Sequence, residues 1–405
     1  TQLEAKELEI SETQDKLDLA KIDESEQYAS MKVRIKYMYE NGDSQMIQVL
    51  FEAKSIGDFL NKAEYIQQVT DYDRQVYEEE LRDFLPDNII DVHVHIYKQE
   101  MQRHSAADRK GCVNWPHMVA PDLTIEDMKQ SYLQMFPGKN VRAVIMGMPS
   151  CRLPEVNEYV LGCSKQEGLP ALYCTNWDTP ADEIRAAMKA GFYGIKPYLN
   201  NSPSYIPANE VRIFDFLTHE HLKVMDELGG IVMLHIPRSL RLRDPVNLAQ
   251  MMEIEEKYPN AKIIIAHIGR AYVPGDIGDA FETLKHTKNM KFDFTANTLT
   301  LAMVKCIEAV GTKRLMFGSD MPITKMRMYR ICEDNHYVNV VPRGAYGDVS
   351  GDPNMKEVDD ASHMTTFMYE ELRAFKRCAE ELKLSREDVC DILCNNTARL
   401  FNMKI

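Results

Sequence analysis

The histidines that could bind a metal ion stand at the ends of short apolar runs. Asp91-Val92-His93-Val94-His95 closes the first run. Side chains alternate faces along a strand, so His93 and His95 point the same way and can reach one metal ion. Taken alone, a His-x-His pair in a chain with 11 histidines is as consistent with chance as with a pair of ligands.

Further candidate ligands follow three other apolar runs. His235 comes after residues 231–234, His267 after residues 263–266 and Asp320 after residues 317–319. Imidazole nitrogens and carboxylate oxygens are common zinc ligands. If the runs are parallel strands of one barrel, their C-terminal ends meet at one mouth, where barrel enzymes carry their chemistry. The residues therefore predict a metal site there, although His267 could instead be a core histidine whose ring is satisfied by the backbone.

Eight apolar runs, separated by helical segments, would position these residues. The runs cover residues 89–96, 141–148, 171–176, 194–199, 231–236, 262–268, 291–296 and 314–318. Near-continuous apolar runs alternating with helices are typical of parallel strands covered on both faces. Eight such repeats predict an α/β fold, a (β/α)8 TIM barrel. A doubly wound open sheet is the competing architecture, but it favours a glycine-rich phosphate loop after its first strand, and the sequence has none there.

Residues 1–86 differ from the barrel segment, and we interpret them as an N-terminal α+β appendage to a catalytic domain at residues 87–405. A charged helical arm, a hairpin around Asn41-Gly42 and a second helical stretch are expected in it. Its apolar side chains, among them Tyr37 and Phe51, need a cover of barrel helices or a neighbouring subunit. We therefore expect a homo-oligomer, a dimer or higher. Residues 324–360 predict a long irregular loop inserted after the eighth strand.

Taken together, these motifs resemble the amidohydrolase superfamily, in particular the amidohydrolase-related branch of metal-dependent TIM-barrel hydrolases and decarboxylases. The matching segments are Ile90-Asp91-Val92-His93-Val94-His95, Gly194-Ile195-Lys196, His235, Ala266-His267-Ile268-Gly269-Arg270, Phe292-Asp293-Phe294, Phe317-Gly318-Ser319-Asp320-Met321-Pro322 and Asn395-Asn396-Thr397-Ala398-Arg399-Leu400-Phe401. The resemblance covers residues 88–405. Residues 1–86 and the insertion depart from the common pattern of the family.

The resemblance implies one divalent metal bound by His93, His95, His235 and Asp320, with His267 beside it. Zinc suits these ligands, and manganese or iron are the alternatives. A metal lowers the pKa of its bound water to about 7, so hydroxide becomes available at neutral pH. Asp320 would contact the metal and accept the proton of the water, and His267 would polarise the substrate carbonyl or steer the hydroxide.

Lys196 stands where binuclear members of the superfamily carry a carbamylated lysine that bridges two metals. We favour one metal, with Lys196 as a substrate-binding or structural residue. Tyr198 and Asn297 are weaker candidates for substrate binding at the same mouth.

Arginines follow two of the predicted strands. Arg238, Arg241 and Arg243 come after the fifth strand and Arg270 after the sixth. A guanidinium group binds a carboxylate in bidentate geometry, so we expect a small anionic substrate. Ion pairs with surface Asp and Glu are the alternative for the group at 238–243.

The composition excludes several other partners. The chain has 405 residues, with 48 basic and 62 acidic side chains and a net charge of −14. This acidic balance argues against nucleic acid or an anionic membrane as a partner. The 9 cysteines show no disulfide pattern and the first residues are polar and acidic, so we expect free thiols in the cytoplasm.

The sequence therefore predicts an enzyme, a metal-dependent hydrolase that uses metal-activated water to cleave an amide, ester or lactone bond in a small, carboxylate-bearing substrate. The first alternative is a metal-dependent non-oxidative decarboxylase of a small aromatic or unsaturated carboxylic acid, because the same ligands serve both reactions. A more distant alternative is a non-catalytic barrel that acts as a binding or assembly module.

Overall fold

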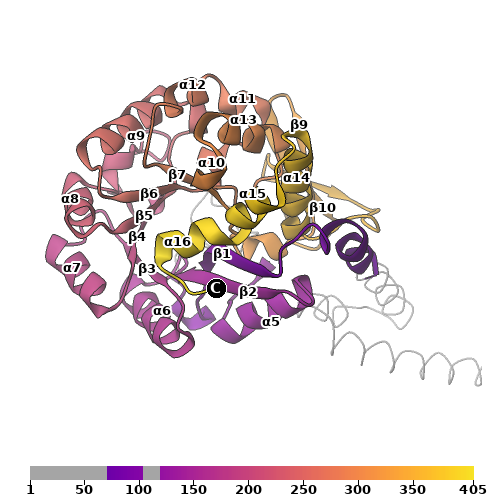
Figure 1. The fold of residues 1–405 in the computed structure, drawn as a ribbon, viewed down its shortest axis with the longest axis horizontal. Coiled ribbons are helices and arrows are strands. Elements are labelled where there is room, and N and C mark those ends of the chain that lie inside the picture. Colours follow the sequence, from indigo (N-terminus) through magenta and orange to yellow (C-terminus); the bar gives the residue numbers. More distant parts are fainter. Residues whose placement is uncertain (1–70, 104–118) are drawn as a thin grey trace, which may run out of the picture. The chain divides into compact units, whose positions relative to one another are not determined.

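A barrel of eight parallel strands forms the centre of the protein. The computed structural model describes residues 71–103 and 119–405, and residues 73–405 make up one compact unit. The strands are β1 (Asn88–His95), β2 (Asn140–Met146), β3 (Ala171–Thr175), β4 (Gly194–Pro197), β5 (Ile231–Leu234), β6 (Lys262–Ile265), β7 (Lys291–Asp293) and β8 (Leu315–Met316). They lie side by side in chain order (Figure 1). All eight predicted strands are confirmed.

Backbone hydrogen bonds join the two ends of this sheet and close the barrel. The N–H of His95 donates to the carbonyl oxygen of Met321 over 3.0 Å, and the N–H of Asp320 donates to that of His93 over 2.7 Å. The predicted TIM barrel is thus confirmed. Closure also brings the ends of β1 and β8, which carry candidate ligands, next to each other.

Helices connect successive strands and surround the barrel (Figure 1). They are α5 (Ile125–Met135), α6 (Leu153–Glu167), α7 (Ala181–Ala190), α8 (His219–Leu228), α9 (Pro245–Lys257), α10 (His267–Arg270), α11 (Pro274–Ile277), α12 (Ala280–Leu284) and α13 (Thr300–Val310), followed after β8 by α14 (Phe367–Glu381), α15 (Arg386–Cys390) and α16 (Asn396–Phe401). Local sequence sets their ends. Thr124 and Asp127 form a capping box at the start of α5, and Gly168 ends α6 in the left-handed conformation.

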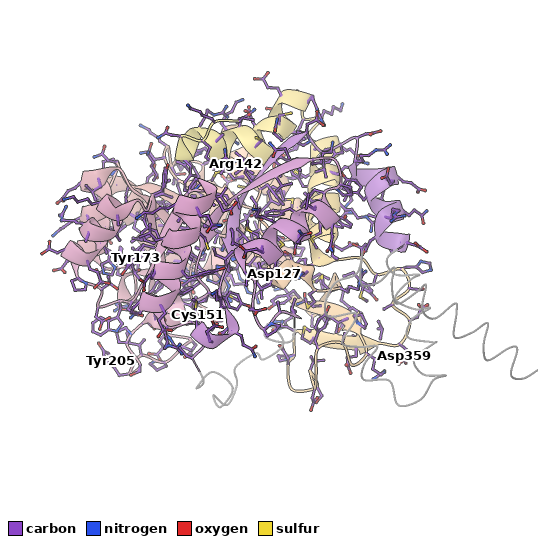
Figure 2. All side chains as sticks on the ribbon, turned by 90° about the horizontal axis from the view of Figure 1, so that it is seen from below. Asp127, Arg142, Cys151, Tyr173, Tyr205 and Asp359 are labelled. Carbon is purple, nitrogen blue, oxygen red and sulfur yellow. The ribbon has the colours of Figure 1, made fainter. Side chains whose placement is uncertain are left out.

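The barrel has two distinct ends. Arg142 of β2 lies on the side of the chain's C-terminus, where its guanidinium donates to the carbonyl oxygen of Lys404. Cys151, Tyr205 and Asp359, which follow strands β2, β4 and β8 along the chain, lie on the opposite side (Figure 2). The segments after these strands therefore share one side of the barrel, as the parallel arrangement requires.

Residues 324–360 form a small sheet, so the predicted irregular loop is wrong. Strands β9 (Tyr329–Glu333) and β10 (His336–Pro342) make an antiparallel hairpin, and β11 (Met355–Val358) pairs with β10 in parallel. The turn residues Asp334 and Asn335 have φ of 48° and 63°, the left-handed values that a tight hairpin turn requires. Alternating apolar residues on both sides of Asp-Asn were the signal for this hairpin, and the glycines and prolines farther along obscured it.

The predicted appendage falls almost entirely outside the described residues, so its arm, its hairpin and its boundary remain predictions. Residues 73–86, at its described end, belong to the same compact unit as the barrel. The hydroxyl of Tyr77 donates to the carbonyl oxygen of Pro137, and Glu80 pairs with Arg373 of α14. Among residues 71–103 and 119–405, each helix is too short or too polar to cross a bilayer.

Gly194 is a point where the barrel tolerates no side chain. A Cβ at this position would lie 1.9 Å from the carbonyl oxygen of Ile231 in the neighbouring strand. Gly194→Ala should therefore lower the free energy of unfolding by at least about 2 kcal/mol, the scale of an overpacked core. Urea unfolding followed by circular dichroism measures the effect. Gly162→Ala, in the middle of α6 with nothing within 4 Å, should be neutral or slightly stabilising; equal losses in the two variants would contradict the packing argument.

Candidate metal centre

His93, His95 and Asp320 form a compact group at the C-terminal end of the barrel. One potential ligand atom from each lies within 4.8 Å of the other two. Nε2 of His95 is 3.1 Å from Oδ1 of Asp320, and Nε2 of His93 is 3.7 Å from the same oxygen. Both histidines are almost fully buried. The shared direction predicted from the His-x-His spacing is confirmed by this geometry.

The Nδ1 atoms of His93 and His95 each lie next to a hydrogen-bond acceptor. Nδ1 of His95 lies 3.0 Å from the carbonyl oxygen of Gly147, and Nδ1 of His93 lies 3.2 Å from Oδ2 of Asp293. Both partners are acceptors, so each imidazole carries its proton on Nδ1 and turns the lone pair of Nε2 toward Asp320. Lone pairs that face a carboxylate need a cation beside them, either a metal ion or the ammonium of Lys196, whose Nζ lies 3.1 Å from Nε2 of His93. The donor set therefore fits a divalent metal.

His267 and His235 lie beside this group. The His267 ring centre is 5.1 Å from that of His93 and 5.0 Å from that of His235. Nδ1 of His267 donates to the carbonyl oxygen of Thr295 over 2.9 Å. Nδ1 of His235 is buried and has no hydrogen-bond partner among the described residues. A buried ring nitrogen without a partner is costly, and a metal or a substrate would satisfy it.

The backbone is strained where these side chains are presented. His267, Arg270 and Asp320 have φ of 58°, 62° and 59°, in the left-handed region. Each such residue costs on the order of 1–3 kcal/mol, and residues of this kind cluster at functional sites. The N–H of His267 donates to Oδ1 of Asp293 over 2.7 Å, so that carboxylate holds two of the site histidines at once.

The electrostatics suit the binding of a cation. Burial lowers the pKa values of His93, His235 and His267, so these imidazoles are neutral at neutral pH. Burial raises the pKa of Asp320, whereas its contacts with His95, His267 and His93 lower it, to about 2. Neutral imidazoles and an ionised carboxylate are the forms that bind metals.

Lys196 and Tyr198 reach the same centre from β4. Nζ of Lys196 is fully buried, 3.1 Å from Nε2 of His93. Burial lowers the pKa of Lys196 to about 8, against the opposing charges of Asp293 and Asp320. The hydroxyl of Tyr198 lies 3.3 Å from Nδ1 of His95. The two residues predicted on the fourth strand thus adjoin the candidate ligands.

Other predicted residues serve the surrounding structure. Nε of Arg238 pairs with Asp244 over 2.9 Å, and that aspartate caps α9. Asn297 is buried, donates to the carbonyl oxygen of Ala271 and accepts the N–H of Leu299. Their roles in substrate binding remain predictions.

Sequence reasoning assigned no role to two buried acids of this region. Asp293 lies within the seventh predicted strand, residues 291–296, and in the matching segment Phe292-Asp293-Phe294, which was the available signal. Glu371 lies on α14, far along the chain, and Oε2 accepts the N–H of Ala296 over 2.8 Å. Burial raises the pKa of Glu371 well above its ordinary value, so its carboxyl keeps its proton to a higher pH than an exposed glutamate does.

A cavity of about 250 Å³ lies away from these residues. Its lining includes Lys262, Lys291 and Arg399, and the two lysines are the first residues of β6 and β7. Barrel enzymes carry their chemistry at the opposite ends of the strands. The cavity is therefore not part of the candidate centre.

Candidate metal ligands at the strand ends of an eight-stranded barrel are the arrangement that metal-dependent TIM-barrel enzymes use. The chain belongs to the amidohydrolase family, whose model matches residues 90–403 and whose members are metal-dependent. The resemblance inferred from the motifs is thus confirmed. A second model, of the coiled-coil domain of peptidoglycan hydrolase PcsB, matches residues 20–84.

Solved structures share this fold at low identity. An amidohydrolase from Burkholderia multivorans with bound zinc is 14% identical, with 78% of this chain and 99% of that chain covered and a TM-score of 0.52. A probable 2-pyrone-4,6-dicarboxylic acid hydrolase from Acinetobacter baumannii with citric acid bound is 17% identical, with coverage of 78% and 99% and a TM-score of 0.46. The 5-carboxyvanillate decarboxylase of Sphingomonas paucimobilis is 11% identical, with coverage of 79% and 100% and a TM-score of 0.49. No curated protein matches the sequence.

Asp293→Asn should weaken metal binding by about 10- to 100-fold, because the amide holds His93 less strongly than the carboxylate does. Competition with a chelating dye measures this affinity. Asp391→Asn is the matched control, since Asp391 is a buried aspartate paired with Arg399 outside the centre. It should leave metal affinity unchanged even if it lowers stability. Equal affinities in wild type and Asp293→Asn would contradict the orienting role.

Glu371→Gln should change how stability depends on pH. The folded protein keeps the Glu371 proton to a higher pH than the unfolded chain, whose glutamate has the ordinary pKa of 4.5. Wild-type stability therefore falls as pH rises from 4.5 toward the folded-state pKa, and glutamine lacks this loss. Unfolding with a chelator present at pH 5 and pH 8 should show a growing advantage for the variant. A constant difference between the two proteins would contradict a protonated Glu371.

Proposed function

We propose that the chain is a metal-dependent hydrolase that cleaves an amide, ester or lactone bond in a small, carboxylate-bearing substrate. The observation that carries the proposal is the group of His93, His95 and Asp320, with the lone pairs of two imidazoles turned toward one ionised carboxylate. His267, adjacent but held by Thr295, adds a group that need not bind the metal.

His93, His95 and Asp320 would hold one divalent ion, with His235 as the fourth ligand. We expect zinc, with manganese or iron as alternatives. When bound, such an ion polarises a carbonyl oxygen and lowers the pKa of water to about 7.

The side chains supply the remaining steps. Asp320, ionised at neutral pH, can accept the proton of the attacking water. Nδ1–H of His267 is committed to Thr295, so its Nε2 is the atom available to the substrate as a neutral acceptor. Lys196, with Tyr198 beside it, and Arg270 offer positive charge to an anionic substrate. Arg238 and Asn297 would act mainly by supporting nearby backbone.

A non-oxidative decarboxylase is the second candidate. The buried Lys196, with Nζ next to His93, favours it, because an ammonium there could hold a substrate carboxylate beside the metal. The two reactions differ in their products, since only the decarboxylase releases carbon dioxide.

His267→Asn should lower turnover by about 100-fold or more, the scale of a general acid–base group, and leave metal content near one equivalent per chain. A screen of amides, esters, lactones and carboxylated aromatics, with detection of carbon dioxide, identifies the substrate for the turnover assay. Elemental analysis measures the metal content per chain. His286→Asn, outside the centre, is the control.

Several outcomes would contradict parts of this proposal. Loss of the metal in His267→Asn would make that residue a ligand. Two equivalents of metal would favour a carbamylated Lys196. Carbon dioxide release without hydrolysis would favour the second candidate, and absence of metal after reconstitution would contradict both.

A further inference from the structure

Two arginines from separate segments stack on two tyrosines, and a third arginine, Arg270, stands two residues before one of these tyrosines. Arg241 follows β5, Arg270 ends α10 and Arg330 lies in β9 of the inserted sheet. The guanidinium carbons of Arg241 and Arg330 are 5.5 and 4.6 Å from the ring centre of Tyr272. They are 4.9 and 4.8 Å from that of Tyr337 on β10. We call Arg241, Arg270 and Arg330 the arginine cluster.

The arginine cluster adjoins the candidate metal centre. The ring centre of Tyr272 is 6.4 Å from that of His267 and 5.2 Å from that of Tyr337. The ring of Tyr272 therefore lies between His267 and Tyr337 of the inserted sheet. On the other side, the guanidinium of Arg270 donates to the backbone oxygen of Arg238 in the segment that follows His235.

The cluster carries more positive charge than its surroundings neutralise. Arg241 pairs with Asp276 over 2.6 Å, and that aspartate also accepts two backbone N–H groups. Arg270 and Arg330 form no ion pair with any carboxylate of the described residues. Nε of Arg241 is buried and has no partner there.

Neutral oxygens hold Arg330 in place without cancelling its charge. Its guanidinium donates to Oδ1 of Asn339 over 2.9 Å and to the carbonyl oxygen of Ala296 over 3.0 Å. Stacking on Tyr272, Tyr337 and Phe367 orients the plane of the group. Removing a guanidinium group from water costs free energy when no carboxylate pairs with it. The arginine cluster therefore favours the binding of an anionic ligand.

We propose that the arginine cluster binds a carboxylate of the substrate that is separate from the reacting group. A dicarboxylate can then place one carboxylate at the metal centre and the other at the arginine cluster. The inference rests on the proposed function, because it takes the reacting end of the substrate to lie at His93, His95 and Asp320. The hairpin of β9 and β10 is then a specificity element, since it contributes Arg330 and Tyr337.

Binding of dicarboxylates and matched monocarboxylates tests the inference. Isothermal titration calorimetry on the zinc-loaded full chain compares glutarate with butyrate and isophthalate with benzoate. At least one dicarboxylate should bind ten times more tightly than its match. Arg330→Gln should remove this advantage and leave the monocarboxylate affinity within twofold, because it deletes one charge-assisted contact.

Arg343→Gln is the matched control. Arg343 is an exposed arginine of the same insertion, paired with Asp359 (Figure 2 labels Asp359). It should retain the preference for dicarboxylates. If Arg330→Gln does not fold by circular dichroism, Arg330→Lys and Arg241→Gln replace it; lysine keeps the charge but loses the two-pronged geometry.

Equal affinities of dicarboxylates and monocarboxylates in wild type would overturn the inference, as would an undiminished preference in the folded Arg330 and Arg241 variants. These measurements need no turnover. A chain that prefers dicarboxylates but catalyses neither reaction would contradict only the proposed function. An active chain without the preference would contradict only the inference drawn from the arginine cluster.

Discussion

The bonds that close the barrel between β8 and β1 position most of the candidate centre. The N–H of Asp320 donates to the carbonyl oxygen of His93, so a ligand from the end of the barrel is tied directly to one from its start. Asp91 strengthens the same junction. Its Oδ1 accepts the N–H groups of His93 and Ser319, and its Oδ2 accepts the hydroxyl of Tyr132 on α5. Burial raises the pKa of Asp91 to about 6, because the charged carboxylate is less stable inside the protein than in water.

Asp293 extends this arrangement to the far side of the centre. Its carboxylate accepts from Nδ1 of His93 and from the N–H of His267, so it couples β1 to the segment after β6. The left-handed backbone at His267 is maintained by that bond. One buried carboxylate thus sets the tautomer of a ligand and the position of the neighbouring imidazole, and both must be correct for metal binding and for acid–base chemistry.

Elements added after β8 surround the centre with charges and aromatic rings. Glu371 of α14 accepts the N–H of Ala296, and the carbonyl oxygen of the same residue accepts from Arg330 of β9. The peptide groups of Ala296 therefore link the C-terminal helix to the inserted sheet. The barrel strands carry the candidate metal centre, while the insertion contributes Arg330 and Tyr337 beside it. Barrel enzymes in general vary their chemistry by changing the loops at the C-terminal end of the strands.

Much of the fold and of the metal centre could be predicted from sequence because their signals are local. Apolar runs mark the eight strands, alternation sets the direction of His93 and His95, and parallel strands bring His235, His267 and Asp320 to one end. The inserted sheet also had a local signal, the Asp334-Asn335 turn, but a long segment with glycines and prolines outweighed it.

The convergence of Arg241, Arg270 and Arg330 had no such signal. These contacts join residues about 30 to 60 positions apart through ring stacking and backbone oxygens, and no periodicity encodes those distances. Sequence alone thus determined which residues face the barrel mouth, because strand period and strand direction decide it. Only the tertiary structure decided which of them touch, because that depends on how separate segments pack.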